Sequence, residues 1–128
     1  MKKFLISLSL LILLATVLAT SAWAGPLEDS LAADAKGDYA TELKINRPLA
    51  VQGVAWAQLL LGVMYDNGQG VVQDYIRAHM WSNLGAVSGD KDAVKNRDIV
   101  ASKMTPQQIG EAQKRARECQ ARQFKNCD

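Results

Sequence analysis

An internal repeat is the feature that most constrains how this chain can fold. When the sequence is laid over itself at an offset of 36 residues, the DY pair at 38–39 falls on the DY pair at 74–75, and AVQG at 50–53 falls on AVSG at 86–89. A period in the mid-thirties is the length that two short antiparallel helices and their turns require. The repeat therefore predicts an all-α chain, an α/α superhelix of about three antiparallel helix pairs.

The first 24 residues have the pattern of a secretory signal peptide. Lys2 and Lys3 precede an apolar run over residues 4–18, and residues 22–24 (AWA) form a small-x-small triplet. The apolar run is about 15 residues long, whereas crossing a bilayer takes about 20. We expect cleavage after Ala24, a periplasmic or secreted chain, and no stable membrane anchor after cleavage; an uncleaved anchor is the alternative.

Charge argues against nucleic acid as the partner. Removing residues 1–24 takes away two lysines and no acids, so the 15 basic and 13 acidic residues become 13 and 13. A formally neutral chain lacks the electrostatic attraction that dominates nucleic-acid binding. The basic residues between Lys114 and Lys125 are interpreted as a solvated helix face, because acidic residues partly offset them.

The two cysteines, Cys119 and Cys127, lie eight residues apart. An exported chain meets an oxidising environment, so we predict that they form a disulfide. The closed ring is small, and its stabilisation should lie near the lower end of roughly 2 to 4 kcal/mol. A metal or redox role is less favoured, because the spacing is not C-x-x-C and no histidine lies nearby.

Glycines and capping residues divide the chain after residue 24 into predicted helices. Their approximate ranges are 26–37, 38–53, 54–67, 74–89, 90–104 and 105–123. The helix at 54–67 is apolar nearly all the way round, which predicts a central, buried position. The helix at 74–89 shows a narrower apolar stripe, namely Ala78, Trp81, Leu84 and Ser88. Residues 105–108 (TPQQ) have the pattern of an N-cap, a first-turn proline and a capping box.

The segment from 55 to 89 resembles the Sel-one-like repeat, a relative of the tetratricopeptide repeat. The resemblance rests on Ala57-Gln58, Leu61-Gly62, Met64-Tyr65, Gly68-x-Gly70-Val71, Asp74-Tyr75, Ala78, Trp81, Ala86 and Gly89. It implies one domain over 25–128, with a near-complete unit at 54–89, a degenerate unit at 26–53, and a C-terminal helical pair at 90–123 followed by the disulfide tail.

The resemblance also implies packing roles and a class of function. Small residues such as Ala57 and Gly62 would let two helices approach closely, with Tyr65 and Trp81 filling the space between them. Members of the family typically act as adaptors or scaffolds, many bacterial ones being exported. The family has no shared catalytic residue to carry over to this chain.

One departure from the family pattern suggests a binding face. The repeat usually has a polar residue at the position of Leu60, and Trp56, Leu60, Val63 and Asn67 follow one another along a single line of the predicted helix. We expect this line to bind a protein or peptide partner if it faces the concave side. The alternative is that the first helix or the C-terminal segment covers it.

No residue pattern supports catalysis, a metal or a cofactor. His79 is the only histidine, and its place in the repeat indicates a packing role. Asp90 and Asp92 are explained by capping and the helix dipole. The leading hypothesis is a non-enzymatic interaction module of the periplasm or secreted fraction. The alternatives are a cell-wall or β-lactam binding protein with weak hydrolase activity, and a homodimeric structural subunit.

Overall fold

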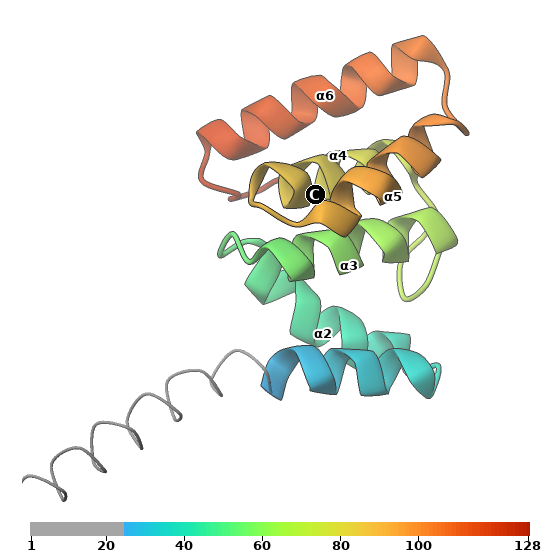
Figure 1. The fold of residues 1–128 in the computed structure, drawn as a ribbon, viewed down its shortest axis with the longest axis vertical. Helices are drawn as coiled ribbons and strands as arrows, with labels where there is room; N and C mark the ends of the chain where they lie inside the picture. Colours follow the sequence, from blue (N-terminus) through green and yellow to red (C-terminus); the bar gives the residue numbers. More distant parts are fainter. Residues whose placement is uncertain (1–24) are drawn as a thin grey trace, which may run out of the picture.

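The computed structural model describes residues 25–128, and the predicted signal peptide lies outside this part of the chain. The described residues form helices and connecting turns without any strand, so the all-α prediction is confirmed (Figure 1). Residues 25–35 are helical and are followed by α2 (Tyr39–Ala50), α3 (Ala55–Asn67), α4 (Tyr75–Val87), α5 (Lys91–Ala101) and α6 (Pro106–Ala121). None of the helices within 25–128 is long and apolar enough to cross a membrane.

Local sequence signals set the helix starts. The side chains of Asp38, Asp74 and Asp90 accept hydrogen bonds from backbone N–H groups of the first turns of α2, α4 and α5. Thr105 and Gln108 form the predicted capping box at the start of α6. Each cap satisfies N–H groups that have no partner inside the helix, which is why these residue types mark the helix starts.

Glycines set the turns between helices. The turn after α3 contains Gly68 and Gly70 with φ of 67° and 72°, in the left-handed region. Gly37, Gly53 and Gly89 also have positive φ and follow the preceding helical segments. Only glycine reaches this region without a steric cost from Cβ, so these positions hold the short turns that let successive helices pack together.

The helices are layered, with α4 and α5 together between α3 and α6. Figure 1 shows residues 25–35 and α2 at one end and α6 at the opposite end. α3 packs against α2, α4 and α5, and α4 packs against α3, α5 and α6. The two helices of the resembling segment therefore lie in the middle of the stack, as predicted for α3.

The core is centred on α4, and here one expectation was wrong. The sequence indicated a narrow apolar stripe on this helix, but His79, Met80 and Ser82 are buried as well, whereas Ser88 is exposed. The reason is that α4 has helices on three sides, so polar side chains between the apolar ones are also enclosed. Trp81 is 0% exposed and is the largest fully buried side chain.

Helices α3 and α4 approach each other closely because Gly62 has no Cβ. A Cβ placed on Gly62 would collide with the Ser82 hydroxyl and come within 3.0 Å of the Ala78 carbonyl oxygen. Gly85 of α4 is also tightly packed, since a Cβ placed on it would lie 3.1 Å from the Ala93 Cβ. Tyr65 and Trp81 belong to the same buried cluster.

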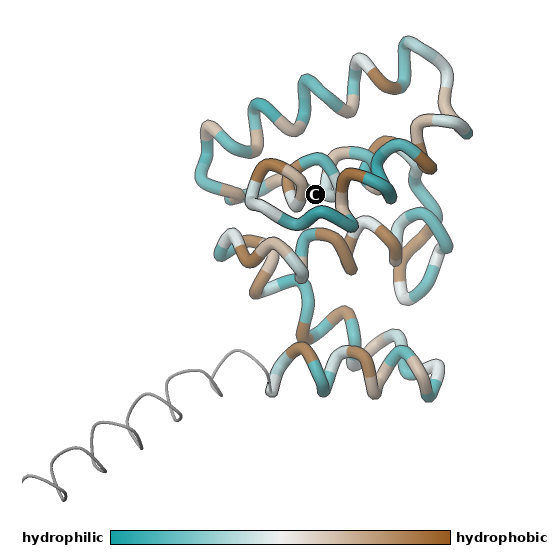
Figure 2. The backbone as a smooth tube through the Cα atoms, viewed as in Figure 1, coloured by the Kyte–Doolittle hydropathy of each residue, from teal (hydrophilic) through white to brown (hydrophobic). Residues whose placement is uncertain are grey.

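The outer helix α6 is mostly hydrophilic, as Figure 2 shows, and the apolar residues are concentrated toward the central helices. It buries only Ala112, Ala116 and Cys119 and packs mainly on α4. Lys114 and Arg117 are exposed, in agreement with a solvated basic face.

Candidate functional site

The line predicted to bind a partner lies on α3 and is only partly accessible. Trp56, Leu60 and Val63 are half-buried, and Asn67 is exposed at the end of the helix. The Trp56 side chain packs against the hydrophobic core. A partner could therefore reach only part of each apolar side chain on this line.

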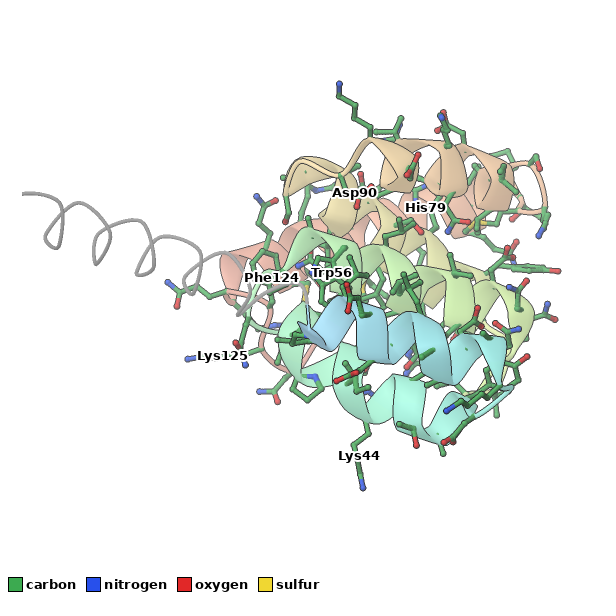
Figure 3. The ribbon with its side chains drawn as sticks, turned by 60° about the horizontal axis from the view of Figure 1, so that its bottom comes forward. Lys44, Trp56, His79, Asp90, Phe124 and Lys125 are labelled. Atoms are coloured by element: carbon green, nitrogen blue, oxygen red, sulfur yellow. A yellow bond between two sulfur atoms is a disulfide. The ribbon has the colours of Figure 1, made fainter. Side chains whose placement is uncertain are left out.

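A groove on α2 is more open to solvent than the line of residues on α3. It has a volume of about 370 Å³ and is lined by Ala40, Leu43, Lys44, Arg47 and Pro48. These residues are spaced three or four apart along one face of the helix, so the groove runs along the helix axis. Its surface is mainly apolar, and its charged side chains are both cationic. Lys44 extends away from the ribbon on this side (Figure 3).

At one side of the groove, Arg47 takes part in a cluster around the carboxylate of Asp128. The Arg47 Nε lies 3.3 Å from Oδ2 of Asp128. The Tyr65 hydroxyl and the Trp81 Nε1–H donate to Oδ1, at 3.0 and 2.9 Å. Arg47 also donates to the Tyr65 hydroxyl oxygen at 3.2 Å. Side chains from α2, α3 and α4 thus converge on one carboxylate.

Tyr65 acts as a hydrogen-bond donor in this cluster. Burial and the neighbouring Asp128 carboxylate raise the pKa of Tyr65, so its hydroxyl stays protonated and able to donate. The Arg77 guanidinium lies over the Tyr65 ring, 5.9 Å from its centroid. Its hydrogen bond with Asp74, and to a smaller extent the charge of Asp128, raise the pKa of Arg77.

The segment that carries Asp128, residues 123–128, is called the tail below. It folds back from the end of α6, and Figure 1 shows the chain end C near the middle of the stack. The predicted disulfide joins Cys119 to Cys127, with Cα atoms 5.2 Å apart, and this is compatible with an oxidising extracellular compartment. The Phe124 ring lies against Gly53, where a Cβ would come within 3.0 Å of it. Gln123, Phe124 and Asn126 have positive φ, a conformation that side-chain-bearing residues seldom adopt.

A buried polar network joins α2 to the first helical segment. The Ser30 hydroxyl donates to Oδ1 of Asn46 at 2.7 Å, and Asn46 Nδ2 donates to Oε1 of Glu42 at 3.4 Å. Oε2 of Glu42 is buried without a hydrogen-bond partner. Burial, with the nearby charge of Asp34, raises the pKa of Glu42 from 4.5 to about 7. This carboxyl therefore titrates near neutral pH.

His79 is buried in the core, and Asp90 and Asp92 lie at the start of α5. His79 is 3% exposed, and burial together with Arg97 lowers its pKa. Asp90 caps α5, and Asp92 lies 3.7 Å from Lys95 on the same helix. Figure 3 shows His79 and Asp90 well away from Lys44 and the α2 groove. Within residues 25–128, no three histidine, cysteine, aspartate or glutamate residues are grouped so that they could hold a metal ion.

Sequence reasoning missed both the α2 groove and the Asp128 cluster. The spacing of Ala40, Leu43 and Arg47 was visible as a helical period, and it could have identified one face of α2. No local signal links Arg47 to Asp128, because 81 residues separate them.

In comparisons with known proteins, no family model matches this chain and no curated protein gives a significant match.

Proposed function

We propose that this chain is an exported, non-enzymatic interaction module of the Sel-one-like repeat type, which binds an extended segment of a protein partner along α2. The observation that carries the proposal is the groove of about 370 Å³ lined by Ala40, Leu43, Lys44, Arg47 and Pro48. Its length along one helix face suits an extended peptide better than a small molecule, which would need a more enclosed pocket.

The chemistry of the groove indicates what kind of segment it takes. Leu43 and Pro48 offer apolar contact, while Lys44 and Arg47 supply positive charge. A segment that alternates apolar and acidic side chains would match both properties. Export is supported by the disulfide between Cys119 and Cys127, since such bonds persist mainly in oxidising compartments.

The family assignment is supported by where the repeat positions lie. Ala57, Leu61, Met64, Ala78 and Trp81 are each 0% exposed. Positions that recur in a repeat because they pack two helices together should be buried in this way. The groove lies outside them, as expected for an adaptor whose scaffold is constant and whose binding surface differs between members.

A site-specific cross-link tests the proposal. A photoreactive amino acid is placed at Ala40 in the groove and, as a control, at Gln113, which is exposed on α6. We expect an Ala40 cross-link to another protein of the cell envelope that Gln113 does not give. It should disappear with Lys44→Glu and persist with Lys114→Glu, an equal charge change at an exposed lysine on α6.

Three results would contradict the proposal. One is that Ala40 gives no product beyond those of Gln113. Another is that Lys44→Glu and Lys114→Glu behave alike. The third is a sole product with twice the mass of the chain, because the groove would then be an interface between two copies.

A further inference from the structure

The cluster around Asp128 is built from donors that need a partner. Trp81 is 0% exposed and Tyr65 is 6% exposed. The indole N–H of Trp81 donates to Oδ1 of Asp128, and the Tyr65 hydroxyl donates to the same atom. A buried donor without an acceptor is strongly disfavoured, so these two side chains require an acceptor at this point.

The required acceptor is anionic. Arg47 Nε lies 3.3 Å from Oδ2 of the same carboxylate. The Arg77 guanidinium is also held over the Tyr65 ring, but its charge is paired with Asp74 at 2.7 Å, so Arg47 is the cation that the acceptor meets. A neutral amide could accept from Tyr65 and Trp81, but only an anion also forms an ion pair with Arg47. Geometry and charge together select a carboxylate.

The cluster is continuous with the α2 groove, because Arg47 belongs to both. A peptide lying in the groove would pass directly beside the position that Oδ2 of Asp128 now occupies. Lys44, one helical turn before Arg47, is the other charged residue of the groove. The positive surface therefore extends from the groove to the cluster, which is complementary to an acidic segment.

The resident carboxylate belongs to a segment that can be displaced. The tail is attached by the Cys119–Cys127 disulfide and by the packing of Phe124 and Cys127 on the core. Asp128 lies outside the ring that this disulfide closes, so its side chain can leave the cluster while the ring stays in place.

We propose that Arg47, Tyr65 and Trp81 form a binding site for an aspartate or glutamate side chain of the peptide partner, and that Asp128 occupies this site in the free protein. This inference rests on the proposed function, since it names the chemistry of the segment that the α2 groove binds. The tail acts as an internal ligand that a partner must displace.

Indole resonances in nuclear magnetic resonance spectra provide the test. Residues 25–128 contain two tryptophans, Trp56 and Trp81, which Trp56→Phe distinguishes. The protein is purified as the cell exports it, as wild type, Asp128→Ala and Asp128→Asn. The probe is an acetylated peptide amide, QFKNSD, which copies residues 123–128 with serine in place of Cys127. The control peptide is QFKNSN.

We expect QFKNSD to shift the Trp81 indole resonance of Asp128→Ala toward its wild-type position, with a Kd of about 1 mM or tighter. Binding should be at least about tenfold weaker for QFKNSN, for oxidised wild type, and for Asp128→Ala combined with Arg47→Gln. Reduction of the Cys119–Cys127 disulfide in wild type should strengthen binding. Asp128→Asn should bind QFKNSD more weakly than Asp128→Ala, because its amide still fills the site.

Two results would overturn the inference. One is an Asp128→Ala protein with native helicity and an unchanged Trp56 resonance whose Trp81 resonance does not respond to QFKNSD. The other is an equal response to QFKNSD and QFKNSN. The two proposals can fail separately. If Ala40 gives a cross-link that depends on Lys44 but the Trp81 resonance does not respond to the peptide, only the carboxylate site is refuted. If the Ala40 cross-link does not depend on Lys44, the proposed function itself is refuted.

Discussion

Glu42 should make the stability of this fold depend on pH in an unusual direction. Its carboxyl has an ordinary pKa of 4.5, which burial raises to about 7 in the folded chain. The folded state therefore holds the proton more tightly than the unfolded state. The stabilising contribution is fully present below pH 4.5 and is lost as the pH rises through 7.

The magnitude follows from the two pKa values. Each pH unit between them corresponds to about 1.4 kcal/mol, so ionisation of Glu42 costs the folded state about 3 kcal/mol relative to the unfolded state. The structural cause is that Oε2 is buried without a hydrogen-bond partner and Asp34 adds a like charge nearby. The one compensating contact is the hydrogen bond from Asn46, at 3.4 Å.

The assay is urea unfolding followed by far-ultraviolet circular dichroism at several pH values from about 4.5 to about 8. The free energy of unfolding of the wild type should fall by about 3 kcal/mol more over this range than that of Glu42→Gln, whose amide does not titrate. Glu118→Gln, at an exposed glutamate on α6, is the matched control and should follow the wild type. Parallel curves for wild type and Glu42→Gln would refute the reasoning.

Three further predictions concern stability. Gly62→Ala should destabilise the fold by about 1 to 3 kcal/mol, because its Cβ would collide with α4. Gly110→Ala, with nothing within 4 Å of the added Cβ, should stabilise α6 by up to about 1 kcal/mol. Similar unfolding midpoints in urea for the two variants would contradict the close approach of α3 and α4. Replacing Cys119 and Cys127 by serine should cost about 2 to 3 kcal/mol, measured by thermal unfolding, and an unchanged midpoint would mean that the ring does not restrict the unfolded chain. Thr105→Ala should lower stability by about 1 kcal/mol through loss of the capping box, and hydrogen exchange at the first turn of α6 should rise; unaltered exchange there would argue against it.

Features that depend on neighbouring residues were predictable from the sequence. The helix starts at Asp38, Asp74 and Asp90 follow from side chains that cap the next turn. The positive φ of Gly68 and Gly70 follows from a turn that only glycine fits well. The disulfide was predictable too, because the signal-peptide pattern predicts an oxidising environment and Cys119 and Cys127 are the two cysteines of the sequence.

The burial of polar residues was not predictable in this way. Ser82 looks like a break in an apolar stripe, yet it is buried because α4 is enclosed by three other helices. The same applies to Glu42, whose neighbours in the sequence give no sign that its carboxyl is buried. Hydropathy patterns report which face of one helix is apolar, and they carry little information about how many helices surround it.

The sequence by itself determined the all-α fold class and the turns, because these depend on interactions within a few residues. Only the tertiary structure decided that the carboxylate of Asp128 is held by side chains from α2, α3 and α4. The contacts of Asp128 with Arg47, Tyr65 and Trp81 join positions that are 81, 63 and 47 residues apart. Their convergence depends on how three helices and the returning tail are placed in space, and no local pattern encodes that placement.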